Sequence, residues 1–144
     1  RIGIETECLL FAKECDLFGT IQRLVHESES EYKCIFIDEA QFMTEEQVKQ
    51  LGLVVDILGI PVLCYGLRSD FQGNLFPGSK QLFALANVLE EIKTVCWCSK
   101  RATMVLRLDE NGLVVKEGNQ IQIGGNDSYV SVCRKHFFEG KSHG

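Results

Sequence analysis

Short apolar runs alternate with stretches of helical periodicity through residues 1–95. The runs are brief and bounded by polar or turn-forming residues, as buried strands are, while the stretches between them repeat apolar residues every three or four positions. Strands are predicted at 8–12, 34–37, 62–65 and 92–95, and helices at 16–25, 44–58 and 79–89. Because strands and helices alternate, the pattern predicts an α/β fold whose central parallel strands are covered on both faces.

Local signals mark the ends of two of these helices. Asp16 stands where an N-cap residue would satisfy free backbone amides of the first helix. Thr44 and Gln47 have the spacing of a capping box at the start of the second. That helix should end at Gly59, which readily takes the left-handed conformation, because Pro61 cannot continue it.

The character of the sequence changes after residue 95. Glycines become frequent, and alternation of apolar and polar residues replaces helical periodicity at 104–108 and 120–123. We therefore expect two domains, a parallel-sheet core at 1–93 and a small, mainly β domain at 94–144.

The composition narrows the class of protein. With 45% hydrophobic residues among 144, the chain can bury a core. Its formal net charge of -5 argues against a surface that binds nucleic acid. Its 7 cysteines, an odd number, indicate reduced thiols and a cytoplasmic location. No apolar run is long enough to cross a membrane, and the printed start lacks the pattern of an export signal.

An acid pair follows the second predicted strand. Asp38 and Glu39 end the apolar run 35–37, and the capped helix comes next, an order that resembles the Walker B element of P-loop NTPases and kinases. There one carboxylate holds Mg²⁺ beside the nucleotide phosphates, and a second can orient or deprotonate the attacking hydroxyl. The alternative is that two acids simply end a strand at the surface.

Four candidate metal ligands lie in the second predicted domain. Cys96 and Cys98 form one pair, and Cys133 with His136 forms another about 35 residues later, which suits a tetrahedral structural zinc. The spacing Cys-x-Cys is tighter than the usual Cys-x-x-Cys. The alternative is a pair of buried thiols plus an exposed histidine.

Several aromatic residues fall just beyond predicted strand ends, where α/β proteins bind ligands. These are Phe42, Phe71, Phe76 and Tyr129. Together their rings could enclose a planar base, although each one taken singly is ordinary packing.

Three segments, 35–42, 62–71 and 123–136, resemble type II thymidine kinases in the same order along the chain, closest to the enteric bacterial branch. The resemblance implies transfer of a phosphoryl group from ATP to the 5′-hydroxyl of thymidine, giving dTMP in deoxynucleoside salvage for DNA synthesis. It also implies a P-loop (RecA-like) parallel-sheet kinase core and a small zinc-ribbon-like β domain with a lasso loop.

The resemblance assigns roles to individual residues. Glu39 is implied as the catalytic base, and the ATP and Mg²⁺ site as Asp38, Glu39, Ala40 and Gln41. The implied thymidine site consists of Phe42, Leu67, Phe71, Phe76 and Tyr129, with the start of the lasso loop, Gln120, Ile121, Gln122, Ile123 and Gly124. The implied structural zinc ligands are Cys96, Cys98, Cys133 and His136. A homotetramer inhibited by dTTP is implied as well.

One departure from the family bears on activity. The printed sequence contains no G-x-x-x-x-G-K-[ST], the loop that holds ATP phosphates and that family members place on their first strand. On this ground the core is expected to lack its first strand, and the printed chain alone is expected to be inactive. A rival interpretation is a non-catalytic zinc-ribbon interaction module, and another is a different P-loop ATPase such as a helicase core.

Overall fold

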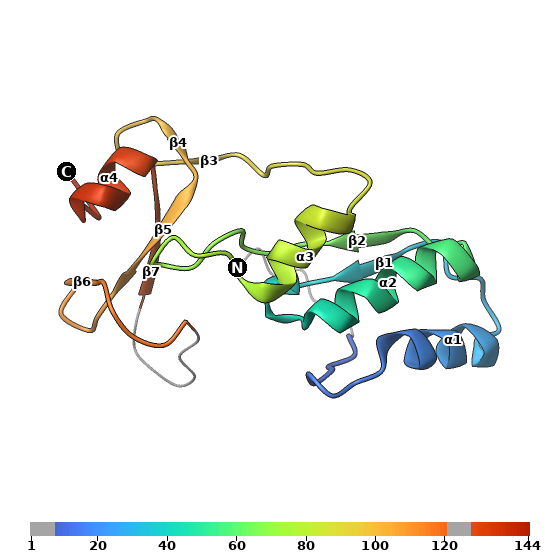
Figure 1. Ribbon diagram of the computed structural model, residues 1–144. Coiled ribbons are helices and arrows are strands. Elements are labelled where there is room, and N and C mark those ends of the chain that lie inside the picture. Colours follow the sequence, from blue (N-terminus) through green and yellow to red (C-terminus); the bar gives the residue numbers. More distant parts are fainter. Residues whose placement is uncertain (1–7, 121–127) are drawn as a thin grey trace.

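The computed structural model describes residues 8–120 and 128–144 (Figure 1). In Figure 1, helices α1, α2 and α3 gather around strands β1 and β2 at one end of the molecule. Strands β3 to β7 and helix α4 lie at the other end. None of the helices in the described ranges is long and apolar enough to cross a membrane.

Two parallel strands form the centre of the first group. Strand β1 (Ile35–Ile37) pairs in parallel with β2 (Val62–Cys64), as predicted. Helices α1 (Leu17–Glu27) and α2 (Glu45–Leu58) complete a buried apolar cluster with one face of this pair. The opposite face is open, because Phe36 is 66% exposed and Leu63 39%. The expectation of strands covered on both faces is therefore wrong for the described residues.

The capped helices begin and end at the residues that the local signals predicted. The Asp16 side chain accepts from the Gly19 amide at 3.1 Å. At the start of α2, the amide of Gln47 donates to the Thr44 hydroxyl and the amide of Thr44 donates to the Gln47 side chain, each at 3.1 Å. Gly59 closes α2 in the left-handed conformation, with φ 68°.

Helix α3 (Pro77–Leu85) is displaced from its prediction at 79–89. Its first residue is proline, whose fixed φ suits the first helical turn and which has no amide to leave unpaired. The residues at 86–93 form no helix and are exposed. The helix therefore begins earlier and ends sooner than the apolar pattern suggested.

Two predicted strands do not form as expected. Residues 8–12 are irregular, and Leu10 is 95% exposed. A strand needs a hydrogen-bonded neighbour, and no described residue pairs with this run. Of 92–95, only β3 (Thr94–Val95) is a strand, and it pairs antiparallel with β4 (Arg101–Ala102) instead of joining the parallel sheet.

The second group is antiparallel. Strand β5 (Met104–Leu108), predicted from its alternation, lies between β6 (Val114–Val115) and β7 (Ser128–Val132). Helix α4 (Arg134–Glu139) follows β7 directly. The group has its own buried cluster, made of Cys96, Ala102, Leu106, Val132 and Cys133. Of the run predicted at 120–123, residues 121–123 lie outside the described part of the chain.

Candidate active site and metal centre

The acid pair lies at the carboxyl end of β1, exposed to solvent. Glu39 has a left-handed backbone with φ 51°, and its amide donates to Asp38 Oδ1 at 2.8 Å. A non-glycine residue in this region is strained, and such strain often occurs at functional sites. The sharp turn is supported by the amide of Ala40, which donates to the carbonyl of Tyr65 beyond the neighbouring strand at 2.8 Å. The two carboxylates are thus set at the edge of the sheet.

Gln41 links the acid pair to the loop after β2. It is 1% exposed and lies in the 3-10 turn η1 (Ala40–Phe42). Its Nε2 donates to Glu39 Oε2 at 2.5 Å, and its Oε1 accepts from the amide of Leu67 at 3.0 Å. Because both ends of its amide are engaged, Gln41 fixes the orientation of the Glu39 carboxylate.

Two glycines allow the neighbouring segments to approach η1. A Cβ at Gly66 would lie 2.5 Å from Gln41 Oε1, and a Cβ at Gly78 would lie 2.5 Å from the carbonyl oxygen of Ala40. The hydroxyl of Ser79 donates to the carbonyl of Leu67 at 2.6 Å. The start of α3 and the loop after β2 therefore pack directly on the turn that carries the acids.

The predicted aromatic residues divide into exposed and buried members. Phe42 packs edge-to-face on Phe76, with ring centroids 5.7 Å apart. Phe76 is buried, and so is Phe71, whose ring lies 5.1 Å from the guanidinium carbon of Arg107. Phe42, Leu67 and Tyr129 are exposed and free to contact a ligand. Buried Phe76 supports Phe42 through this ring contact.

Asp70 joins the aromatic loop to the segment predicted as the lasso. Its Oδ1 accepts from the amides of Gln72 at 2.9 Å and Asn74 at 2.8 Å, and its Oδ2 accepts from Gln120 Nε2 at 2.8 Å. The Gln120 side chain is therefore committed to Asp70. The other predicted lasso residues lie outside the described part of the chain: Ile121, Gln122, Ile123 and Gly124.

Sequence reasoning missed both Asp70 and Arg107. Asp70 had a local signal, since an aspartate a few residues before a glycine commonly caps a turn, and Gly73 here has φ 87°. Arg107 had none, because a buried arginine inside an alternating strand looks like an ordinary outward-facing residue.

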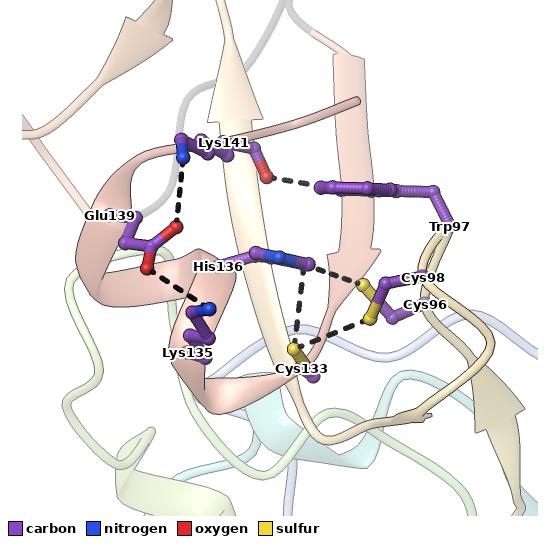
Figure 2. A network of polar contacts seen from close by, with 8 residues as sticks. All are labelled: Cys96, Trp97, Cys98, Cys133, Lys135, His136, Glu139 and Lys141. Carbon is purple, nitrogen blue, oxygen red and sulfur yellow. Dashed lines mark hydrogen bonds and ion pairs between the residues drawn. The ribbon is translucent and has the colours of Figure 1, made fainter. Parts of the chain in front are cut away.

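The four predicted metal ligands come together in one cluster (Figure 2). Cys96 and Cys98 lie in the turn between β3 and β4, where Ser99 takes a left-handed backbone at φ 64° and its amide donates to the Cys96 carbonyl at 2.8 Å, which closes the turn. Cys133 is the N-cap of α4, and His136 lies on that helix. The tight Cys-x-Cys spacing thus does not prevent both thiols from facing the second pair.

Three distances in the cluster lie near those around a tetrahedral ion, and all four ligand atoms lie within 4.8 Å of one another. Nδ1 of His136 lies 3.3 Å from Cys96 Sγ and 3.5 Å from Cys133 Sγ, and the Cys98 and Cys133 sulfurs are 3.9 Å apart. Ligand atoms around a tetrahedral zinc lie roughly 3.5–3.8 Å apart. His136 is 7% exposed, so the alternative with an exposed histidine is wrong. These four residues could hold a metal ion, and they are consistent with structural zinc.

The charge in the cluster also favours a cation. Burial raises the pKa of the Cys96 thiol, but hydrogen bonds from the Cys98 backbone and the His136 side chain outweigh it and lower the pKa to about 6. The backbone of Lys100 lowers the pKa of Cys98, but burial and the adjacent thiols Cys96 and Cys133 outweigh that effect and raise it. One thiolate therefore forms readily, and further ones need a positive charge beside them.

Comparison with known proteins identifies the family of the chain. A family model described as thymidine kinase matches residues 3–137. The chain is 59% identical over 139 residues to a thymidine kinase of Pasteurella multocida, which covers 96% of this chain and 71% of that protein. It is 55% identical over 137 residues to a thymidine kinase of Rhizobium meliloti, covering 95% of this chain and 70% of that protein. The chain belongs to the thymidine kinase family.

Proposed function

We propose that this protein, when it carries the phosphate-binding loop of its family, transfers the γ-phosphoryl group of ATP to the 5′-hydroxyl of thymidine, forming dTMP. The observation that carries the proposal is the acid pair at the end of β1, with the Glu39 carboxylate held by the buried Gln41 at 2.5 Å. Phosphoryl transfer depends mainly on positioning and electrostatics, because its transition state is loose. A carboxylate with a fixed orientation beside a nucleotide site meets that need.

In this proposal Glu39 is the catalytic base. It orients the 5′-hydroxyl and takes its proton as the oxygen bonds to the γ-phosphorus and the bond to the leaving ADP oxygen breaks. Asp38, Ala40 and Gln41 lie beside it in the same turn and are proposed to border the nucleotide site. Mg²⁺ bound with ATP neutralises charge on the phosphate oxygens.

The nucleoside is proposed to bind beside the same turn. Phe42, Leu67 and Tyr129 offer exposed apolar and aromatic surface, and buried Phe76 supports Phe42 through their ring contact. Residues 120–124 are proposed to bind the base through backbone groups. The described contact of the Gln120 side chain with Asp70 leaves its backbone available for that role.

The metal bound by Cys96, Cys98, Cys133 and His136 is proposed to be a structural zinc. All four ligand positions are filled by the protein, which is the pattern of a closed structural site rather than a catalytic one. The ion would fasten the β3–β4 turn to α4 and so stabilise the proposed domain 94–144, whose apolar cluster is small.

A homotetramer inhibited by dTTP and a cytoplasmic location are proposed on the family resemblance. Sedimentation of the purified protein tests the tetramer, and a thymidine kinase assay with and without dTTP tests the inhibition. A tetramer whose activity falls with added dTTP supports the proposal, and a monomer that ignores dTTP contradicts it.

Substitution of Glu39, in a version of the protein that includes a phosphate-binding loop, tests the proposed chemistry. Glu39→Gln keeps the size and the hydrogen bond to Gln41 but removes the base, so thymidine phosphorylation should fall about 10²–10⁴-fold in kcat. Glu46→Gln is the matched control, because Glu46 is an exposed acid on α2 whose ion pair to Lys49 spans 3.8 Å. Both variants should melt like the parent protein. Undiminished kcat in Glu39→Gln would exclude Glu39 as the base.

A further inference from the structure

The only tryptophan of the chain lies against a predicted metal ligand. The indole of Trp97 stacks on the imidazole of His136, with ring centroids 4.0 Å apart and an interplanar angle of 11° (Figure 2). Trp97 stands between Cys96 and Cys98 in the β3–β4 turn, whereas His136 lies on α4. The contact therefore joins the two halves of the metal cluster through a residue, Trp97, that is not itself a predicted ligand.

The segment after α4 holds the indole in place. Gly140 ends α4 in the left-handed conformation with φ 65°, and the amide of Lys141 then donates to the carbonyl of His136 at 2.9 Å. The carbonyl of Lys141 accepts from Trp97 Nε1 at 3.4 Å. The three contacts form a closed loop. His136 bonds to Lys141 through the backbone, Lys141 accepts a hydrogen bond from Trp97, and Trp97 stacks on His136.

Further contacts steady the same segment. The carboxylate of Glu139 pairs with Lys141 Nζ at 3.2 Å and with Lys135 Nζ at 3.7 Å, and the hydrogen bond from Lys141 lowers the pKa of Glu139. A Cβ at Gly144 would lie 2.6 Å from a ring carbon of Trp97, so the backbone there packs directly against the indole. Figure 2 shows this network around the cluster.

We propose that Trp97 is a positioning residue of the metal centre, and that residues 140–144 clamp it onto His136. His136 must rotate about its Cβ–Cγ bond to carry Nδ1 away from the thiolates, and that rotation breaks the parallel contact with the indole. The clamp keeps the ring in its ligating orientation and slows loss of the ion. This inference rests on the proposed zinc centre.

Zinc release from purified, zinc-loaded protein tests the clamp. With excess chromophoric chelator, Trp97→Ala should release zinc about tenfold faster than the parent, the scale on which neighbours of metal ligands act. Trp97→Phe should stay close to the parent rate, because the stacking face remains. Removal of residues 141–144 should accelerate release, because it takes away the acceptor for the indole N–H. Phe138→Ala is the matched control, since Phe138 is an aromatic of α4 that is 75% exposed.

The fluorescence of Trp97 gives an independent readout. As the only indole, it should change emission with the same time course as zinc release, because losing the ion frees His136 to leave the stack.

Trp97→Leu keeps apolar bulk without an aromatic face, and it decides the question if circular dichroism shows that Trp97→Ala is unfolded. Fast release from folded Trp97→Leu supports the clamp.

The outcomes separate the two proposals. Parent protein that neither contains zinc by atomic emission nor binds it when supplied overturns the zinc centre and the clamp together. Parent protein that binds zinc, with release equally slow in the folded Trp97→Ala or Trp97→Leu variant, overturns the clamp alone. Equal acceleration in Phe138→Ala also overturns it, because the effect would then be general to α4.

Discussion

Glu39 and Gln41 show how single residues shape the proposed catalytic turn. Glu39 accepts a left-handed backbone, and Gln41 is buried with both ends of its amide bonded. Gly66 and Gly78 make room for that turn by having no side chain. Strain at one residue is thus offset by close packing from three others.

Gly78→Ala should disturb this packing. Its new methyl would meet the Ala40 carbonyl at 2.5 Å, and a backbone atom cannot move aside as a flexible side chain can. We expect a loss of about 1–3 kcal/mol in the free energy of unfolding, with lower thymidine phosphorylation. Urea unfolding and a kinase assay measure the two effects.

Gly52→Ala is the matched control for this change. Gly52 also lies in a helix, α2, but nothing lies within 4 Å of its Cβ position. Alanine there should raise stability by roughly 0.5–1 kcal/mol, because it removes the entropy cost of glycine in a helix. Equal stability of the Gly78 and Gly52 variants would show that the close approach of α3 to η1 is unimportant.

At the scale of elements, helix α2 is defined by its two ends. Thr44 and Gln47 satisfy each other's backbone amides at the start, and Gly59 closes the end. The start matters to the site, because Thr44 follows η1 and so fixes where the turn of the acid pair stops. The helix and the site therefore share one boundary.

Thr44→Ala should remove the capping box. The hydroxyl that accepts from the Gln47 amide at 3.1 Å is lost, and we expect a destabilisation of about 1 kcal/mol. Thr44→Ser retains the hydroxyl and should stay within a few tenths of a kcal/mol of the parent. Thermal unfolding followed by circular dichroism compares the three proteins. A melting temperature of Thr44→Ala equal to that of Thr44→Ser would argue against a role for the cap.

At the scale of the whole molecule, the described residues connect the two groups of elements through side chains of the loop after β2. The Gln120 side chain reaches Asp70 at 2.8 Å, and Arg68 Nη2 donates to the carbonyl of Thr103 at 2.8 Å. Arg107 of β5 lies over the ring of Phe71. These contacts place the loop after β2 beside the stem of the predicted lasso.

Asp70 and Gln120 should be energetically coupled. Asp70→Ala and Gln120→Ala each remove the same hydrogen bond, so their combined effect on the free energy of unfolding should fall short of the sum by about 1 kcal/mol. Urea unfolding of the parent, both single variants and the double variant measures the coupling. Gly52→Ala on α2, whose added methyl meets nothing within 4 Å, is the control, and its effect should add to that of Asp70→Ala. If the effects of substituting Asp70 and Gln120 simply added, that result would contradict an energetic link between the two residues.

Sequence patterns predicted the parts that depend on neighbouring residues. Asp16, Thr44 and Gly59 each act within one helical turn, and their helices were confirmed at those ends. The prediction of a strand at 8–12 was wrong. An apolar run indicates that its residues favour burial, but it does not indicate which strand will pair with it. Local pattern alone could not supply the partner.

In the candidate site too, features that depend on local spacing were predicted, and features that depend on distant contacts were not. The metal cluster was predicted, because cysteine and histidine are few enough for their spacing to be informative. Trp97, Asp70 and Arg107 were not, since their roles depend on contacts with residues far away in the chain. The pairing of Glu39 with Gln41 was only partly visible, because the left-handed turn that brings them together has no sequence signal at a glutamate.

The metal cluster has a topological consequence. Since Cys98 and Cys133 meet at one point, residues 99–132 form a ring that an ion would close. The tip between β5 and β6, near Gly112, is exposed and lies inside that ring. A protease that cuts there would break the chain between the two pairs of ligands, but the ion would still bind both pairs. With zinc bound, the cleaved protein would keep both pieces together, and only a chelator acting with a denaturant would let them separate.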